Sequence, residues 1–445
     1  MNPKTHSKRE RFVSRWMPKC AGVIARILLF GSAAGAQEIA ATPRHADGIY
    51  AAGEKIEWRI SASGVTEARY AVTKDGFSLL ASGTLPLTSG SGVLETSLNE
   101  PGTVLVKLVS TASNKNAAVL MGAVVEPFKI RPSSPCPADF DAFWKSKIEE
   151  LNKIPANPVI EQGESNDPAV DYTKVRLDNI GGTHVYGQLA KPKGEGKYPA
   201  MLIFQGAGVY KLTKSTVTLR AREGWLAFNI MAHDLPIDEP DAFYQQLEAT
   251  SLHGYMGFGN DDRDKSYFLR MFLGCCRAAS YLASRPDWDG RVLIATGTSQ
   301  GGFQSLATAA LYPGITAALV DVPAGSDNAG PGVGHSVSFP WFGPGTDSAG
   351  KPKDARKVAE TSGYFDAVNF ASRIKCPVLM GVGLIDQTCP AMGVLTSYNQ
   401  VRGTKEIVIM RDAPHSSKGN THAAYLARWT AWLNALKKGA LVSTQ

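Results

Sequence analysis

The sequence predicts an α/β protein whose main domain is built on a mostly parallel, doubly wound sheet, preceded by a small β-sandwich. In the C-terminal part, continuously apolar runs alternate with helical patterns, as parallel strands buried on both faces and their crossover helices require. In the N-terminal part, short segments of alternating polarity are separated by turn residues, a pattern typical of antiparallel sheets.

The first 36 residues carry most of the net charge. The formal charge of the chain is +7, and residues 1–36 hold seven Lys/Arg against one Glu. These basic residues precede the apolar run "AGVIARILLF" and the small residues Ala34-Gly35-Ala36, which is the layout of a secretory signal peptide with its cleavage site. We therefore expect a signal peptide over 1–36 and an exported protein, periplasmic or secreted. A disordered basic tail is the alternative.

The rest of the chain is nearly neutral and has no basic cluster. This argues against nucleic-acid binding, which depends on phosphate neutralisation. No apolar run reaches the length of a bilayer-spanning helix, so no stable membrane insertion is expected. No Cys, His or acidic cluster has metal-ligand spacing, and we expect neither a metal nor a cofactor. The cysteines outside the leader are expected to be mostly buried free thiols.

Residues 37–130 are expected to form the sandwich, which would be immunoglobulin-like. Its strand-like segments are "KIEWRISASG", "EARYAVTKDG", "SLLASGTLPLTSGSG", "TVLVKLVST" and "AAVLMGAVVEPFKI". They contain no plausible catalytic set, so we interpret this domain as a packing or positioning module, with a carbohydrate-binding module as the alternative. The Pro/Ser-rich stretch "RPSSPCP" follows and places the boundary near residue 130.

Residues 131–445 are expected to form the second domain. It opens with an amphipathic helix whose Phe140, Phe143, Trp144 and Ile148 share one face. Its strand-like runs are "YPAMLIFQG" (198–206), "WLAFNIMAHD" (225–234), "RVLIATG" (291–297), "AALVDVP" (317–323), "CPVLMGVGLID" (376–386) and "EIVIMRDAPH" (406–415). Residues 324–365, rich in Gly, Pro, Ser and Asp, are expected to form an elaborated loop region over the sheet edge.

Ser299 lies in the string Gly297-Thr298-Ser299-Gln300-Gly301, between a predicted strand and a predicted helix. A serine nucleophile held on a sharp strand-to-helix turn needs glycines at these flanking positions, because strand and helix crowd together there. The string alone is weak evidence, but its context makes Ser299 a candidate nucleophile and predicts an α/β-hydrolase fold.

Two later residues complete the pattern that such a nucleophile requires. In α/β-hydrolases an acid and then a histidine follow the nucleophile along the chain, on loops after later strands. Asp386 follows "PVLMGVGLI", and His415 follows the next strand, "EIVIM". We predict that His415 is the general base and that Asp386 orients its ring. His422 is the alternative base.

Other residues are candidates for binding. The backbone N–H groups of Gln300 and Ala207 are predicted to stabilise an oxyanion, the first by its position and the second because it follows "MLIFQG". Tyr255 and His253, in an aromatic and polar loop, and His233 are candidate substrate-binding residues. For His233 a surface position without a role is the simpler interpretation.

The chain resembles the acetyl xylan esterase/cephalosporin C deacetylase family, carbohydrate esterase family seven. The likeness covers about residues 135–435 and runs in order through "CPADFDAFW", "YPAMLIFQGAG", "DDRDKSYFLRMFLGCCRAASYLASRPDWDG", "GTSQGG" and "GLIDQTCPA". The resemblance implies a serine esterase that removes acetyl groups from acetylated oligo- or polysaccharides, with its triad at Ser299, Asp386 and His415.

Three positions depart from the family pattern. Gln205-Gly206-Ala207 stands where His-Gly-Tyr is usual, "MAHDLP" (231–236) replaces an Arg-Gly-Gln motif, and Ser416 replaces a common Glu after His415. These changes bear on the substrate and the loops more than on the reaction type.

Other functions remain open at this point. A serine peptidase or another α/β-hydrolase esterase is the alternative enzyme, and a non-catalytic carbohydrate-binding protein is the alternative outside the enzymes. The oligomeric state is left open. A small ester needs only the triad and the oxyanion donors, so a soluble chain lacking residues 37–130 is expected to keep its rate on 4-nitrophenyl acetate within about tenfold.

Overall fold

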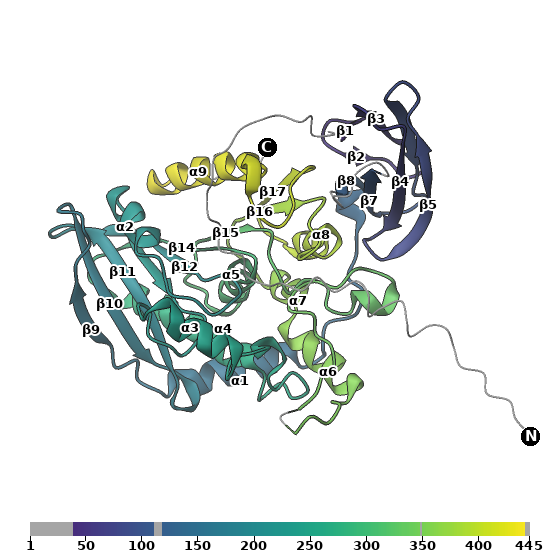
Figure 1. Cartoon of the computed structure of the whole chain (residues 1–445). Coiled ribbons are helices and arrows are strands. Elements are labelled where there is room, and N and C mark those ends of the chain that lie inside the picture. The colour runs from purple at the N-terminus through teal and green to yellow at the C-terminus, as the bar shows by residue number, and fades with distance from the viewer. Residues whose placement is uncertain (1–38, 111–117, 348, 441–445) are drawn as a thin grey trace, which may run out of the picture. The chain divides into compact units, whose positions relative to one another are not determined.

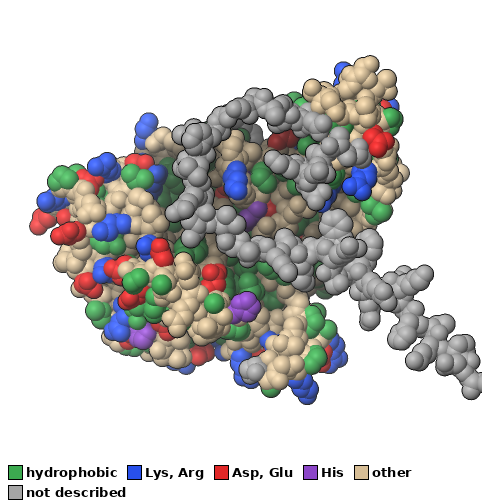
Figure 2. Space-filling view, viewed as in Figure 1, with side chains coloured by type: hydrophobic (Ala, Val, Ile, Leu, Met, Phe, Trp, Pro, Cys, Tyr) green, Lys and Arg blue, Asp and Glu red, His purple; other side chains and the backbone are tan. Residues whose placement is uncertain are grey.

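The computed structural model describes residues 39–110, 118–347 and 349–440 (Figure 1). The expected signal peptide at 1–36 lies outside the described residues. Among the residues described, no helix combines the length and the apolarity that a membrane crossing requires. On the face seen in Figure 2, basic and acidic side chains are intermixed, as expected because the chain after residue 36 is nearly neutral.

The N-terminal strands form two sheets that enclose one core. One sheet has the order β1-β3-β6 and the other β2-β8-β7-β4-β5. Trp58 and Ile60 of the first sheet belong to the same buried cluster as Val72 and Val106 of the second. The predicted β-sandwich is therefore confirmed. The strands are β1 (Ile39–Pro43), β2 (Ile49–Tyr50), β3 (Ile56–Ala62), β4 (Glu67–Lys74), β5 (Ser78–Pro86), β6 (Ser91–Thr96), β7 (Gly102–Ser110) and β8 (Ala118–Val125).

The main sheet has nine described strands in the order β17-β16-β15-β14-β12-β13-β11-β10-β9. Pairing is parallel from β17 to β13 and antiparallel from β13 to β9. The strands are β9 (Val159–Gly163), β10 (Val170–Asp178), β11 (His184–Pro192), β12 (Tyr198–Phe204), β13 (Leu226–Ile230), β14 (Trp288–Thr298), β15 (Ala317–Asp321), β16 (Val378–Gly383) and β17 (Lys405–Met410).

Helices cover both faces of this sheet, which confirms the doubly wound architecture. Successive residues along a parallel strand, such as Leu293 and Ile294 of β14, enter two different buried clusters, because strand side chains alternate between faces. One cluster is closed by α4, α5, α7 and α8, and the other by α2 and α9 (Figure 1). The helices are α1 (Phe140–Asn152), α2 (Ser215–Arg222), α3 (Asp241–Ala249), α4 (Tyr267–Ser284), α5 (Gln300–Leu311), α6 (Ala355–Ser362), α7 (Ala367–Ala371), α8 (Ala391–Gln400) and α9 (Ala423–Lys437).

Two regions differ in detail from the expectation. The antiparallel strands β9 to β11 were not predicted, because β10 alternates buried and partly buried residues and has no long apolar run. Residues 324–365 were expected to be a loop region, but they contain α6 and the short 3-10 helices η4 (Gly330–Val333) and η5 (Gly363–Phe365). The remaining short 3-10 helices are η1 (Pro127–Lys129), η2 (Ile180–Gly182), η3 (Tyr255–Gly257) and η6 (Lys418–Asn420).

Candidate active site

Ser299 occupies the junction between β14 and α5 in a strained backbone conformation. Its φ is 59° and its ψ is −124°, a combination that non-glycine residues rarely adopt. The flanking glycines make the turn possible. A Cβ at Gly297 would lie 2.5 Å from the carbonyl carbon of Gly301, and a Cβ at Gly301 would lie 2.6 Å from the carbonyl oxygen of Phe204. The Ser299 hydroxyl is thereby held at the end of the strand.

Asp386, His415 and Ser299 form an unbroken chain of hydrogen bonds. Nε2 of His415 lies 2.9 Å from Oγ of Ser299, and its Nδ1 lies 2.8 Å from Oδ2 of Asp386. The other Asp386 oxygen accepts the backbone N–H groups of Thr388 and Cys389, both at 2.8 Å. Asp386 is buried, whereas 27% of the His415 side chain is exposed. The ring can therefore exchange a proton with Ser299 while the carboxylate keeps its orientation.

The sheet explains why these residues meet. The strands β14, β15, β16 and β17 are successive parallel neighbours, so their carboxyl ends lie at one edge. Ser299 follows β14, Asp386 follows β16 and His415 follows β17. Residues from distant parts of the sequence thus converge at the edge where ligands of open α/β sheets bind.

His422, the alternative base, does not contact Ser299. Its Nδ1 lies 2.7 Å from Oδ2 of Asp321, and its Nε2 lies 2.9 Å from the carbonyl oxygen of Pro414. The side chain is 2% exposed. The hydrogen bond to Asp321 raises the pKa of His422 above its usual value. Both ring nitrogens therefore bind groups other than Ser299.

The two predicted oxyanion donors remain available. Within the described residues, the amide N–H groups of Gln300 and Ala207 have no hydrogen-bond partner. The Ala207 loop is fastened to α5 by side chains: Nε2 of Gln300 donates to Gly206 O at 3.3 Å, and Nε2 of Gln304 donates to Gln205 O at 2.8 Å. Both glutamines are fully buried. The loop and the helix N-terminus therefore form one hydrogen-bonded unit.

Tyr255 and His233 support this loop from inside the protein. The Tyr255 hydroxyl donates to Oε1 of Gln300 at 2.6 Å and accepts the Gly208 N–H at 3.4 Å. His233 contacts the carbonyl oxygen of Gly208 through Nε2 at 3.0 Å and the Tyr267 hydroxyl through Nδ1 at 2.7 Å. The interpretation of His233 as a surface residue is wrong, because it is fully buried. Burial lowers the pKa of His233 to about 4.

The candidate substrate residues therefore differ in position. Tyr255 is 3% exposed and His233 is 0% exposed, so their rings face the protein interior. His253 is exposed on the turn that precedes η3. No described contact places these three side chains around Ser299 as a group.

Cys389 is a neighbour of Ser299 that the sequence analysis did not single out. Its thiol is buried, and burial raises its pKa well above the usual range, while the neighbouring Ser299 and Ser338 act in the opposite direction. The thiol is therefore neutral. Ligand atoms of Asp386, Cys389 and His415 lie within 4.8 Å of one another, a grouping hidden in the sequence because only the first two are close along the chain. A Cys three residues after the predicted acid was the available signal.

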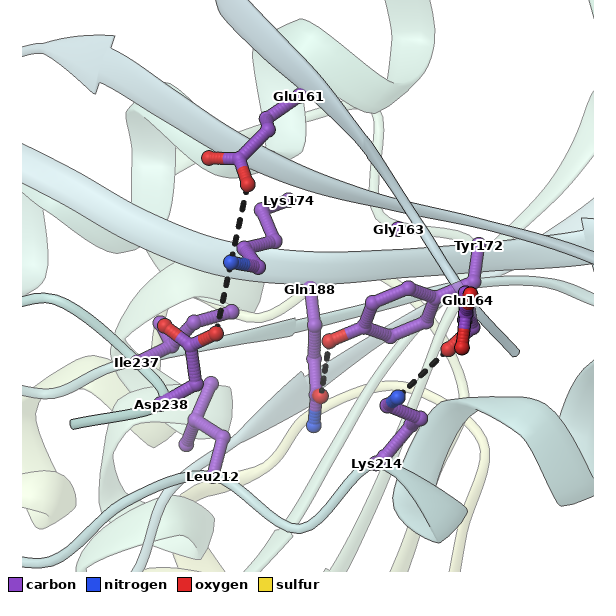
Figure 3. Close-up of a pocket in the computed structure, with 10 residues that line it drawn as sticks. All are labelled: Glu161, Gly163, Glu164, Tyr172, Lys174, Gln188, Leu212, Lys214, Ile237 and Asp238. Carbon is purple, nitrogen blue, oxygen red and sulfur yellow. Dashed lines mark hydrogen bonds and ion pairs between the residues drawn. The ribbon is translucent and has the colours of Figure 1, made fainter. Parts of the chain in front are cut away.

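A pocket of about 310 Å³ lies apart from the Ser299 group (Figure 3). Nζ of Lys174 lies 3.1 Å from Glu161 and 2.7 Å from Asp238, so this ammonium is already paired within the pocket. Lys214 donates to the Glu164 carbonyl oxygen at 2.5 Å. The lining residues are Glu161, Gly163, Glu164, Tyr172, Lys174, Gln188, Leu212, Lys214, Ile237 and Asp238.

The described cysteines carry no disulfide. Cys136, Cys275, Cys276, Cys376 and Cys389 are all free, and three of them are buried. Burial raises the pKa of Cys276 and of Cys376 to about 12 in each case. The expectation of mostly buried free thiols is confirmed for these five residues, while Cys20 lies outside the described part of the chain.

The doubly wound sheet, with a serine on its strand-to-helix turn, defines an α/β-hydrolase. Comparison with known proteins identifies the family. The model of the acetyl xylan esterase (AXE1) family matches residues 125–433, and the chain belongs to this family. It is also 32% identical over 391 residues to the acetyl esterase Axe7A of Xylanibacter ruminicola, with 85% of this chain and 87% of that protein covered.

Two solved structures support the same assignment. The acetyl xylan esterase from Paenibacillus sp. R4 has a TM-score of 0.59 and 25% identity, covering 69% of this chain and 98% of that one. Acetyl xylan esterase 1 from Thermoanaerobacterium sp. JW/SL YS485 has a TM-score of 0.57 and 25% identity, covering 68% and 96%. The α/β-hydrolase fold is thus confirmed, and the protein is a carboxylic ester hydrolase.

Proposed function

We propose that this protein is a serine esterase that removes acetyl groups from acetylated oligo- or polysaccharides. The substrate class rests on the family and on the names of the relatives, which act on acetyl esters and acetyl xylan. The mechanism rests on one observation, the hydrogen-bond chain from Asp386 through His415 to Ser299. The comparisons do not favour a peptidase or a non-catalytic binding protein.

In the proposed reaction, His415 takes the proton of Ser299 as Oγ attacks the acetyl carbonyl carbon. The carbonyl oxygen becomes an oxyanion that accepts the N–H groups of Gln300 and Ala207. Collapse of this intermediate breaks the ester bond, and the sugar hydroxyl leaves with the proton from His415. Water then attacks the acetyl-serine by the same route and releases acetate, while Asp386 holds the ring throughout.

The buried side chains around residues 205–208 would keep the oxyanion donors in place. Gln205 stands where the family usually has His, and its side chain donates to Tyr210 O at 2.7 Å and accepts the Ala232 N–H at 3.0 Å. His233, with its lowered pKa, stays neutral at neutral pH. We therefore assign Gln205, Tyr255 and His233 to loop support and leave them out of direct substrate binding.

The test compares Ser299→Ala with Ser305→Ala, a matched control on the same helix whose hydroxyl donates to Gly301 O at 2.8 Å. Acetate release is measured from 4-nitrophenyl acetate, acetylated xylan and acetylated xylo-oligosaccharides. Ser299→Ala should lower kcat by ~10⁴-fold or more, while Ser305→Ala stays within about tenfold of the parent. Near-normal turnover by a folded Ser299→Ala variant would reject the mechanism. Activity on the small ester without acetate release from either carbohydrate would reject the substrate class.

We also propose that residues 1–36 direct export to the periplasm or the medium and that residues 37–130 and 131–445 are the two domains of the mature protein. The layout of charge, apolar run and small residues supports the leader. Cell fractionation with N-terminal sequencing tests it. A mature chain beginning at residue 37 outside the cytoplasm is expected, and an uncleaved cytoplasmic chain would contradict it.

A further inference from the structure

The N-terminal sandwich contacts the segments that hold the proposed catalytic residues. The family match begins at residue 125, after the first seven strands of the sandwich, so the match itself assigns these strands no role. Two separate sets of contacts join the sandwich to the catalytic domain. Both lead to the loop that carries Asp386.

The first set joins β8 to Leu384, two residues before Asp386. A Cβ at Gly122 would lie 2.6 Å from the Leu384 Cβ and 2.7 Å from its carbonyl oxygen, so only glycine allows this close approach. Gly48, beside β2, meets the same leucine: a Cβ there would lie 3.2 Å from Leu384 Cδ1. Leu384 is 4% exposed and belongs to the same buried cluster as Val124 of β8.

Leu384 has little freedom to move independently of Asp386. Its N–H donates to Met410 O at 3.1 Å, and the Asp386 N–H donates to Gly383 O at 3.3 Å, so a tight turn connects the two residues. Asp386 in turn receives the N–H groups of Thr388 and Cys389. A shift of the Leu384 backbone therefore moves the carboxylate that orients His415.

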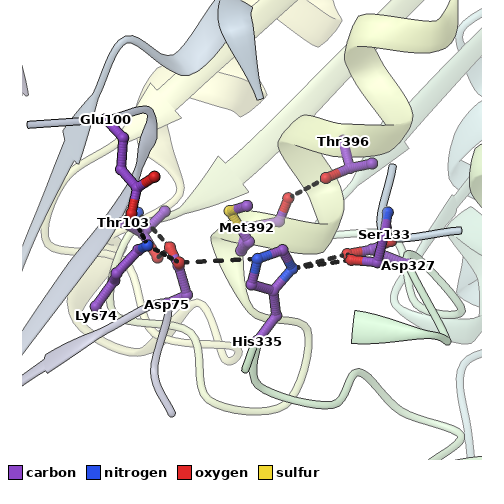
Figure 4. Close-up of polar contacts among 9 residues, drawn as sticks. All are labelled: Lys74, Asp75, Glu100, Thr103, Ser133, Asp327, His335, Met392 and Thr396. Atoms are coloured by element: carbon purple, nitrogen blue, oxygen red, sulfur yellow. Dashed lines mark hydrogen bonds and ion pairs between the residues drawn. The ribbon is translucent and has the colours of Figure 1, made fainter. Parts of the chain in front are cut away.

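The second set joins the turn after β4 to residues 335 and 336. Figure 4 shows Asp75 of this turn facing His335. The Ser336 N–H donates to Asp75 O at 2.9 Å, and Nε2 of His335 lies 3.9 Å from Oδ2 of Asp75. The Asp75 side chain is buried and fixed by the Thr103 N–H at 2.7 Å. On its other side, Nδ1 of His335 lies 3.2 Å from Oδ2 of Asp327. His335 thus sits between an aspartate of the sandwich and one of the catalytic domain.

The segment fixed in this way, residues 324–339, is bonded to both ends of the active site. At one end the Ala324 N–H donates to Ser299 O at 3.1 Å. At the other end the Phe339 N–H donates to Thr388 O at 2.9 Å, next to the residues that hold Asp386. The sandwich therefore reaches the acid loop directly through β8 and indirectly through this segment.

We propose that the sandwich is a positioning part of the active site. The positioning residues are Gly122 on β8 and, in the facing segment 324–339 of the catalytic domain, His335. This proposal rests on the proposed function. β8 and the turn after β4 hold the Asp386 loop in register with His415 and Ser299. This proposal replaces the expectation that a chain without residues 37–130 would keep its rate on a small ester within about tenfold, since even a small ester depends on the orientation of His415.

Gly122→Ala tests the direct contact in the full chain. The added Cβ must push the Leu384 backbone, so we expect kcat on 4-nitrophenyl acetate to fall by ~10 to 100-fold with KM within about twofold, because orientation of the base matters in the transition state. Gly92→Ala is the matched control. Its Cβ would lie 2.9 Å from Leu87 Cδ2 and from Pro86 O, which strains the sandwich alone, and kcat should stay within about threefold.

His335→Ala tests the indirect contact. The matched control is His184→Ala on β11, because His184 also lies between two aspartates, at 3.8 Å from Asp178 and 3.4 Å from Asp234. We expect kcat to fall by roughly threefold to tenfold for His335→Ala and to remain unchanged for the control. Wild-type kcat in a folded Gly122→Ala variant overturns the proposal, as does an equal loss in Gly92→Ala. If Gly122→Ala does not fold, the His335→Ala variant serves as the test, and wild-type kcat in that folded variant overturns the proposal. Turnover by Ser299→Ala would instead reject the proposed function, so the two failures are distinguishable.

Discussion

His415 and His422 lie seven residues apart, and each pairs with an aspartate in nearly the same geometry. The distance from Nδ1 to the carboxylate is 2.8 Å for His415 with Asp386 and 2.7 Å for His422 with Asp321. The pairs differ at the other ring nitrogen. Nε2 of His415 faces a serine hydroxyl, whereas Nε2 of His422 faces the carbonyl oxygen of Pro414.

Under the proposed mechanism, this difference separates a chemical role for His415 from a structural role for His422. A hydroxyl can give its proton to Nε2. A peptide carbonyl has no proton to give, so it only accepts a hydrogen bond from a protonated Nε2. His415 is partly exposed, so a substrate can reach it, whereas His422 is closed off from solvent. A histidine–aspartate pair is thus insufficient to identify a general base, and the group that Nε2 faces decides its role.

The largest expected contrast is in catalytic rate. His415→Ala should lower kcat/KM on 4-nitrophenyl acetate by ~10⁴-fold, because the proton of Ser299 then has no acceptor. His422→Ala should stay within about tenfold of the parent. Steady-state kinetics on both variants, with circular dichroism to verify folding, checks this. The opposite ranking would make His422 the base and break the comparison.

The effect on stability should have the opposite order, with a larger loss for His422→Ala than for His415→Ala. His422→Ala leaves buried partners unsatisfied at Asp321 and Pro414 and should lower the free energy of unfolding by roughly 2 kcal/mol. His415→Ala should cost less than about 1 kcal/mol, since water can reach the partly exposed site. Urea denaturation measures both. A larger loss for His415→Ala would show that the exposed pair also carries the structural role.

The smallest expected effect is the pH dependence of the His422 contribution. Its folded pKa is raised by Asp321, so the stabilisation is fully present below the unfolded value and is lost as the pH rises through the raised folded value. The stability advantage of the parent over His422→Gln should therefore be larger at pH 5.5 than at pH 8.5. Urea denaturation at the two pH values decides. An advantage that grows with pH would contradict the assignment.

The sequence predicts the parts of the fold that follow from local pattern and strand order. Parallel strands have long apolar runs, and their carboxyl ends share one edge, so Ser299, Asp386 and His415 could be named from their places after predicted strands. The antiparallel strands β9 to β11 lack such runs. The hydrogen-bond distances among Ser299, Asp386 and His415 come only from the structure.

The supporting contacts could not be predicted because they join side chains that are remote in the sequence and carry no motif. His233 was expected at the surface, but Gly208 and Tyr267 bind both of its nitrogens inside the protein. Gly122 resembles any strand glycine until Leu384 is seen against it. Burial and partner choice depend on the whole packing arrangement, which a single sequence does not encode in its periodicity.

The position of β17 has a consequence for how activity is acquired. It is the outermost strand on its side of the described sheet and pairs there with β16, and His415 follows it. Ser299 and Asp386 can therefore be assembled on the inner strands while His415, the proposed proton acceptor, is still missing. Under the proposed mechanism, ester hydrolysis would begin during refolding only once β17 has paired with β16. The time at which activity appears would therefore report the completion of the sheet.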